Sequence, residues 1–388
     1  MRTETQQELI DIIRFEIRGI PLPDGFLVSD EESLVKLSKK HDLSHLVYDA
    51  LNKNDIGFSD SSVIQQYYAA IWRSEQMIHE LKSMTELFEK EGIDFIPLKG
   101  AVMRDLYPES WMRTSADIDI LLREDNFETA CKMLTSELLY AEEQENTMQH
   151  LSFRSPANNV NIEVHRMLLT EYQADQNVIE QLPLVWEQAR PYPGHEHFMQ
   201  MSDPCFYFYH IAHMAKHLSR SGGCPIRSLI DLWILDKQPD RDESGRAELL
   251  KKGGLLTFGQ VMSSTAKAWL EGGNVPSEEL EQFILTGQLY RNSKNRVLLG
   301  IGSDGLAKFV LKRLFLPYDL LKYSYPVLQK HRWLTPFFQI VRWTKVFKRK
   351  YHGWLNARVK VYLHANHKEI DQLSHIKDIL GIKNNDEE

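Results

Sequence analysis

The segment "IPLKGAVMRDLYPESWMRTSADIDILLRED", residues 96–125, decides the fold because it places two aspartates in a run with the composition of a buried strand. Successive side chains of a strand point to opposite faces, so Asp117 and Asp119 share one face while Ile118 and Ile120 occupy the other. Two carboxylates this close repel each other, and the repulsion opposes ionisation unless a positive charge lies between them. Because a divalent cation is the usual source of that charge, the pattern predicts a metal site.

The residues on either side predict a small mixed sheet. "IDFIPL" at 93–98 and "ADIDILLR" at 116–123 have the composition of strands, and "KGAVMRDLY" between them indicates a turn that enters a short helix. "EDNFETACKMLTSELL" at 124–139 predicts a helix whose first turn is acidic.

A predicted hairpin adds a third carboxylate. "MQHLSFRS" at 148–155 and "NVNIEVHRML" at 159–168 flank the turn sequence "PANN". Alternation along the second strand places Glu163 and His165 on one side and Ile162 and Val164 on the other. If this strand pairs with the aspartate strand, three carboxylates converge.

Helical spacing dominates the rest of the chain, and we expect an α+β fold in which a small mixed sheet with helices is framed by N-terminal and C-terminal helical regions. Apolar periodicity predicts helices at 5–18, 31–40 and 44–54, a long helix ending at Gly92, and later helices at 203–220 and 226–237. The expected regions are an N-terminal helical region at 1–90, an α/β core at 91–175, a helical domain at 176–300, and a basic, aromatic-rich helical region at 301–388.

Composition limits the class of protein. With 43% hydrophobic and 26% charged residues among 388, the chain has an ordinary globular composition, which argues against disorder. The N-terminus has no apolar signal region and no stretch approaches the length of a membrane span, so we expect a cytoplasmic protein without a transmembrane segment. Cys131, Cys205 and Cys224 form no CxxC pair, and we interpret them as structural thiols.

Several motifs together resemble a known family. "PLKGAVMRDLYP", Arg113, "DIDILL" and "IEVH" occur in the order found in the uncharacterised nucleotidyltransferase family of the polymerase-β-like nucleotidyltransferase superfamily. "HMAKHLSRSGGCPIRSLIDLWIL", residues 213–235, is similar to that family's downstream pattern of His, Lys, His, Arg and Asp. The resemblance extends over roughly residues 30–350.

The resemblance implies an enzyme and assigns roles to its residues. Asp117, Asp119 and Glu163 would bind Mg²⁺ or Mn²⁺, and a nucleotidyl group would pass from an NTP to an unidentified hydroxyl or phosphate acceptor. Glu163 would bind the acceptor-side metal or act as the general base. Gly100 would let backbone N–H groups approach the phosphates, with Lys99 and Arg113 adding positive charge.

One departure leaves a second interpretation open. The superfamily commonly has Gly-Ser at this turn, whereas Ala101 follows Gly100 here. The lost hydroxyl favours, weakly, a catalytically degenerate binding or antitoxin-like module of the same fold. Retention of three mutually repelling carboxylates favours catalysis.

The helix at 203–220 carries His210, His213, Lys216 and His217. Packing is the common role for such histidines, and the spacing completes no zinc set. We expect Lys216 and His217 to contact the nucleotide or the acceptor. Arg227 and Asp231, four residues apart, are interpreted first as an ion pair within one helix and alternatively as a brace for the active site.

The C-terminal region carries an excess of positive charge. From Lys308 to Lys360 there are thirteen Lys and Arg residues against one acid, Asp319, and aromatic residues lie between them. Such a surface could bind an anionic partner such as a membrane or a nucleic acid. The alternative, which we prefer from the sequence, is a helical cap whose aromatics are buried.

Overall fold

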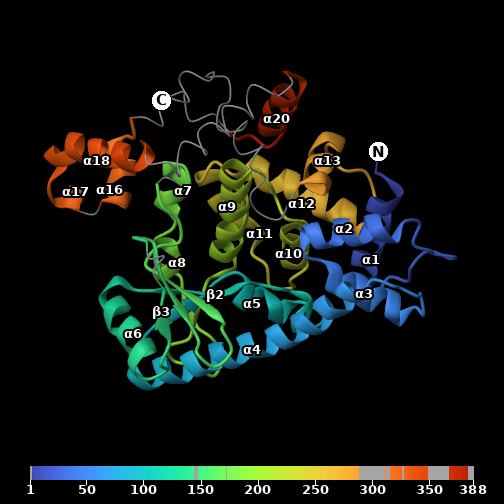
Figure 1. The fold of residues 1–388 in the computed structure, drawn as a ribbon, viewed down its shortest axis with the longest axis horizontal. Coiled ribbons are helices and arrows are strands. Elements are labelled where there is room, and N and C mark those ends of the chain that lie inside the picture. The colour runs from blue at the N-terminus through green and yellow to red at the C-terminus, as the bar shows by residue number, and fades with distance from the viewer. Residues whose placement is uncertain are drawn as a thin grey trace.

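The computed structural model describes residues 2–143, 147–171, 173–287, 311, 315–325, 327–347 and 367–382. It confirms the α+β class, because a five-stranded mixed sheet lies among helices that precede and follow it in the chain (Figure 1). Within these residues, no helix has both the length and the apolar character needed to cross a bilayer. The three cysteines are buried and free of disulfides, as expected for structural thiols.

The N-terminal helices follow the predicted boundaries to within a few residues. They are α1 (Glu4–Arg18), α2 (Glu31–His41), α3 (Ser44–Lys53) and α4 (Ser61–Glu91). Side-chain caps begin three of them, since Thr3, Asp30 and Asp60 each accept a hydrogen bond from a backbone N–H of the first turn. Gly92 ends α4 with a φ of 69°, a conformation that glycine adopts without steric cost.

The sheet is built from β1 (Phe95–Pro97), β2 (Asp117–Leu122), β3 (Ala141–Glu142), β4 (His150–Arg154) and β5 (Asn161–His165). Their order is β1-β2-β5-β4-β3, with β2 parallel to β5 and the other neighbouring pairs antiparallel. The predicted hairpin is present as β4 and β5, and the predicted pairing of β5 with the aspartate strand is confirmed. The two-residue strand β3 was not predicted.

Short elements connect the strands. Between β1 and β2 lie α5 (Gly100–Met103) and two 3-10 turns, η1 (Arg104–Leu106) and η2 (Ser110–Met112), and α6 (Glu124–Ser136) follows β2. One face of the sheet packs on α4 and α6, whose apolar side chains form a core with Ile118, Ile120, Ile162 and Val164. Figure 1 shows α4 running along the lower edge of the molecule beneath the strands. The carboxylates therefore face the other way.

The second half of the chain covers the carboxylate face. It comprises α7 (Gln176–Gln181), α8 (Leu184–Glu187), β6 (Arg190–Pro191), β7 (Met199–Gln200), α9 (Asp203–Ser221), α10 (Ile226–Asp236), α11 (Glu243–Lys252), α12 (Leu256–Glu271) and α13 (Glu278–Thr286). The described C-terminal elements are α16 (Tyr318–Ser324), α17 (Val327–Lys330), η4 (Arg332–Leu334), α18 (Thr335–Phe347) and α20 (His367–Ile379). In Figure 1, α9 stands above the sheet near the centre of the molecule.

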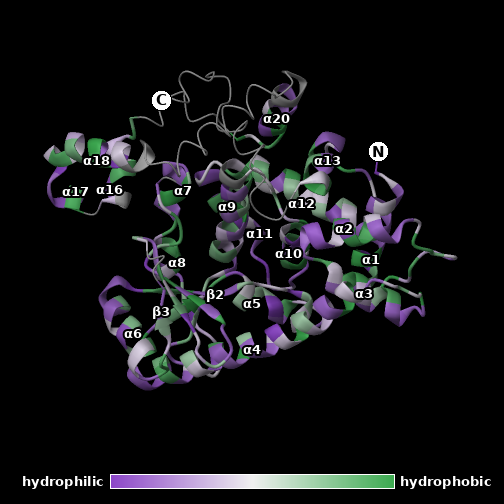
Figure 2. Cartoon of the chain, viewed as in Figure 1, coloured by the Kyte–Doolittle hydropathy of each residue, from purple (hydrophilic) through white to green (hydrophobic). Residues whose placement is uncertain are grey.

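A large core joins helices that are far apart in the sequence. Apolar side chains of α1 to α3 pack with those of α9, α10, α12 and α13, and with Leu373, Ile376 and Leu380 near the C-terminus. Figure 2 shows green and purple residues alternating along these helices, as amphipathic helices require. The core therefore crosses the expected limits at 90 and 175, and the division into four regions remains a proposal.

Candidate active site

Strand register brings the three predicted carboxylates together. Asp119 lies opposite Glu163 in the parallel pairing of β2 with β5, and Asp117 lies opposite Asn161. One carboxylate oxygen from each of Asp117, Asp119 and Glu163 lies within 4.8 Å of the other two. The alternation that buries Ile118 and Val164 on one face therefore also produces a cluster of acids on the other.

Asp119 is the compensated member of this cluster. It is 6% exposed, and its Oδ2 lies 3.1 Å from Nζ of Lys99 while its Oδ1 lies 2.7 Å from Nε2 of His165. Burial alone would raise the pKa of Asp119, but the charge of Lys99 and the hydrogen bond from His165 hold it well below its ordinary value. Asp119 is therefore ionised at neutral pH.

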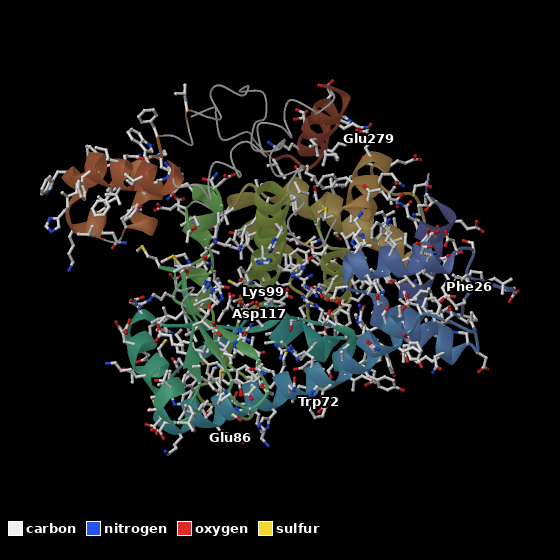
Figure 3. The ribbon with its side chains drawn as sticks, viewed as in Figure 1. Phe26, Trp72, Glu86, Lys99, Asp117 and Glu279 are labelled. Carbon is white, nitrogen blue, oxygen red and sulfur yellow. The ribbon has the colours of Figure 1, made fainter. Side chains whose placement is uncertain are left out.

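Asp117 has much less compensation. Burial, followed by the negative charges of Asp119 and Glu163, raises the pKa of Asp117 to about 7. Figure 3 shows Asp117 beside Lys99 at the centre of the molecule, between the sheet and the helices above it. The site thus holds an incompletely balanced negative charge, which a bound cation would offset.

The turn at Lys99 and Gly100 lies directly behind the acids. Lys99 has a φ of 45°, which is uncommon for a residue with a side chain, and this backbone directs its ammonium group to Asp119. A Cβ at Gly100 would lie 3.1 Å from Cβ of Ser115, so a side chain at this position would crowd Ser115. Position 101 is alanine and supplies no hydroxyl. The Ser115 hydroxyl lies beside the turn, where it accepts a hydrogen bond from Arg104.

Arg113 braces the segment that precedes β2. Its guanidinium donates to both oxygens of Asp231 in α10, with Nε–Oδ1 and Nη2–Oδ2 distances of 2.7 and 2.8 Å. The Tyr107 hydroxyl donates to the same carboxylate at 2.7 Å. Arg227 donates to Thr114 and pairs with Asp42. These contacts favour the brace interpretation of Arg227 and Asp231, and the phosphate contact of Arg113 remains a prediction.

Helix α9 presents a basic and aromatic surface to the acids. Burial, with the nearby charge of Lys99, lowers the pKa of Lys216 to about 8, although Asp119 and Glu163 act in the opposite direction. Burial also lowers the pKa of His217 to about 3, and its Nε2 lies 3.1 Å from Nε2 of His213. Lys216 is therefore close enough to the carboxylates to interact with them, whereas His217 is a neutral partner of His213.

Two residues of the site were not predicted from the sequence. His150 lies opposite His165 in the antiparallel pairing of β4 with β5, and only the register of the hairpin reveals this. Tyr209 precedes Lys216 by seven residues on the same face of α9 and is buried next to Lys99, and burial raises the pKa of its hydroxyl to about 12. The helical spacing from Lys216 was the available signal for Tyr209.

Comparison with known proteins agrees with this arrangement. The family described as uncharacterised nucleotidyltransferase matches residues 28–271, which include the sheet, the acids, α9 and α10. The match ends well before residue 350, the limit expected from the motifs. Searches of curated proteins and of solved structures found no match. Since the family match spans most of the chain and contains every residue of the acidic cluster, the chain belongs to the uncharacterised nucleotidyltransferase family.

Proposed function

We propose that this protein is a metal-dependent nucleotidyltransferase that moves a nucleotidyl group from an NTP to a hydroxyl or phosphate acceptor. The observation that carries the proposal is the convergence of Asp117, Asp119 and Glu163 on one face of the sheet. Lys99 and His165 lie closest to Asp119, and His165 also lies 3.4 Å from Glu163, so the positive charge is concentrated on the side away from Asp117. Cytoplasmic localisation, where NTPs are available, is part of the proposal.

The donor set fits Mg²⁺ or Mn²⁺. Three carboxylates offer hard oxygen ligands, and the raised pKa of Asp117 reflects the repulsion that a cation would relieve. Asp117 and Asp119 would be the shared ligands and Glu163 the ligand nearest the acceptor. When bound, such cations neutralise charge on the phosphates and make an acceptor oxygen more nucleophilic.

The remaining residues suit an in-line displacement at the α-phosphorus. The acceptor oxygen forms a bond to that phosphorus, the bond to the oxygen bridging the α- and β-phosphates breaks, and pyrophosphate leaves with the bonding electrons. Glu163, or water next to it, takes the acceptor proton. Lys216 and Lys99 supply positive charge toward the triphosphate, with His217 at the edge of the α9 surface and Gly100 at the turn.

A catalytically degenerate binding or antitoxin-like module is the alternative of a different class. Such a module would not need three acids held within 4.8 Å of one another, because like charges at this spacing oppose each other's ionisation.

Calorimetric titration combined with single-turnover kinetics tests the proposal. The wild type should bind an NTP in the presence of Mg²⁺ or Mn²⁺, and Glu163→Gln should slow transfer far more than it weakens NTP binding, because Glu163 acts on the attacking oxygen. Glu196→Gln, an exposed acid outside the sheet, is the matched control and should change neither quantity. Failure of the wild type to bind any NTP with either metal would support the binding-module alternative.

We also propose an anionic lipid surface as a partner for the C-terminal helices. Trp333 is 77%, Phe337 58% and Ile340 56% exposed, and they recur at helical spacing beside the exposed cations Lys330 and Arg332. Exposed aromatic and aliphatic groups flanked by cations are typical of helices that lie in a membrane interface. A helical cap with buried aromatic residues, which we prefer from the sequence alone, does not account for these three exposed residues, although Phe338 and Trp343 are partly buried. The cations Lys348, Arg349 and Lys350 lie outside the described residues.

A further inference from the structure

Two histidines border the acidic cluster on its side away from Asp117. The β4–β5 register places His150 directly opposite His165, and Glu163, two residues before His165, points to the same face. The imidazole rings have centroids 5.1 Å apart. This face of the sheet thus carries oxygen donors on β2, the carboxylate of Glu163 and the imidazole of His165 on β5, and the imidazole of His150 on β4.

The ligand atoms of this second cluster converge as they would around one ion. Nε2 of His165 lies 3.4 Å and Nε2 of His150 lies 3.9 Å from Oε2 of Glu163. Ligand atoms bonded at about 2.1 Å to a single first-row metal ion are roughly 3.0–3.4 Å apart, so small side-chain movements would complete the site. Ligand atoms from His150, Glu163 and His165 all lie within 4.8 Å of one another.

We propose that His150, Glu163 and His165 form a site for a divalent transition-metal ion, such as Mn²⁺, that shares Glu163 with the carboxylate cluster. The inference rests on the proposed function, which it deepens by assigning the acceptor-side cation to imidazole as well as carboxylate ligands. Imidazole ligands favour first-row transition metals, whereas Mg²⁺ prefers oxygen. Two histidines and one carboxylate also leave positions open for an acceptor oxygen and water.

A purely structural role for the two histidines explains the position of His165 but not that of His150. His165 holds Asp119 with an Nε2–Oδ1 distance of 2.7 Å. Because one ring nitrogen cannot donate a proton and bind a metal ion at once, an ion at Nε2 would replace this hydrogen bond and leave Asp119 paired with Lys99. His150 has no comparable function, because its Nε2 is beyond hydrogen-bond distance of Glu163 at 3.9 Å and its Nδ1 lies 3.5 Å from the Thr147 hydroxyl. The position of His150 toward Glu163, with only long polar contacts, fits a metal ligand better than a packing residue.

Binding of Mn²⁺ to the full chain, followed by electron paramagnetic resonance, tests the inference without an activity assay. The wild type should show nitrogen hyperfine coupling to bound Mn²⁺. His150→Gln should reduce that coupling and weaken Mn²⁺ binding by about tenfold or more, with Mg²⁺ binding little changed. His79→Gln, which alters an exposed histidine on α4, is the matched control and should bind Mn²⁺ like the wild type.

The outcomes separate this inference from the proposed function. Bound Mn²⁺ without nitrogen coupling, or equal Mn²⁺ affinity in wild type and His150→Gln, would overturn the histidine site while leaving a carboxylate-bound metal in place. Nitrogen coupling in the wild type that is reduced in His150→Gln, together with weaker Mn²⁺ binding, would support it. If neither Mg²⁺ nor Mn²⁺ binds the wild type, both the histidine site and the proposed metal-dependent transfer are wrong.

Discussion

At the scale of single residues, the two aspartates of the DxD motif are not equivalent. Alternation along the strand predicts only that they share a face, and from that alone removing either charge would relieve repulsion. The structure instead pairs Asp119 with both Lys99 and His165, while the pKa of Asp117 is raised to about 7 by burial and its acidic neighbours. Loss of either charge should abolish transfer, with opposite effects on stability.

We expect Asp117→Asn to leave the metal-free free energy of unfolding unchanged or higher, because it removes a repelling charge. Asp119→Asn should lower it by about 1–3 kcal/mol, since Lys99 and His165 lose their charged partner. Denaturant unfolding in the presence of a chelator measures both. A larger loss of stability in Asp117→Asn than in Asp119→Asn would contradict the assigned pairing.

Lys216 gives the site a testable pH dependence. Burial and Lys99 lower its pKa to about 8, so Lys216 is charged below that pH and becomes neutral above it. NTP affinity should therefore decline as the pH rises from about 7 to 9. Lys216→Arg should remove the decline because arginine stays charged throughout this range.

Measuring the dissociation constant of an NTP across this pH range checks the assignment. Lys132→Arg, an exchange at an exposed position of α6, is the matched control and should retain the decline. A wild-type affinity that does not change between pH 7 and 9 would show that Lys216 does not contact the nucleotide.

The sequence predicts those site residues that obey local periodicity and misses those that depend on distant partners. Asp117, Asp119 and Glu163 follow strand alternation, so their common face could be predicted. Asp231 lies in α10, far along the chain from its partner Arg113, and no local pattern connects the two. His150 similarly acquires its position only from the hairpin register.

At the scale of elements, the contact between α10 and the segment before β2 should contribute to stability. Arg113 is 8% exposed, and Asp231 accepts from it at both oxygens. Asp231→Asn should lower the free energy of unfolding by about 3–5 kcal/mol, because it leaves a buried guanidinium without its counter-charge. Transfer activity should fall with it, since Arg113 lies only a few residues before Asp117.

Chemical denaturation provides the measurement for this brace. Glu243→Gln disrupts the exposed pair Arg241–Glu243 and serves as the control, with an expected change of about 0–1 kcal/mol. Equal losses in the two variants would mean that the Arg113–Asp231 pair contributes no more than a surface ion pair.

Element boundaries were predictable where a capping residue marks them. Gly92 ends α4 as predicted, and Asp60, which caps its first turn, has a residue type that commonly precedes a helix. The strands β3, β6 and β7 were not predictable because two residues carry no detectable alternation, and their pairing is decided by tertiary contacts.

At the scale of the whole molecule, the helices α16 to α18 should bind anionic membranes. The wild type should bind vesicles that contain anionic phospholipid at low salt, and binding should weaken as salt screens the cations. Trp333→Ala combined with Phe337→Ala should reduce binding, because it removes the exposed apolar groups.

Vesicle sedimentation measures this effect. Trp72→Ala, which removes an equally large side chain that is 66% exposed on α4, is the matched control and should bind like the wild type. If the wild type bound RNA but did not sediment with vesicles, the lipid partner would be contradicted and a nucleic acid would be favoured instead.

The arrangement of the whole molecule was the least predictable level. The sequence indicates a sheet between helical regions, but it does not show that α1 to α3 share a core with α9, α10, α12 and α13. That packing depends on complementary apolar surfaces from segments separated by more than a hundred residues, which periodicity cannot pair.

Transfer of label from NTPs tests the central claim, that Asp117, Asp119 and Glu163 catalyse metal-dependent nucleotidyl transfer. Each of the four NTPs, labelled with ³²P at either the α- or the γ-phosphate, is incubated with Mg²⁺ or Mn²⁺, a cell extract and either wild type or Asp117→Asn. We predict that one α-labelled NTP labels an acceptor only with the wild type, while the γ label leaves as pyrophosphate. Acceptor labelling by the γ-phosphate, labelling that persists in Asp117→Asn, or no labelling with any NTP and either metal would contradict the claim.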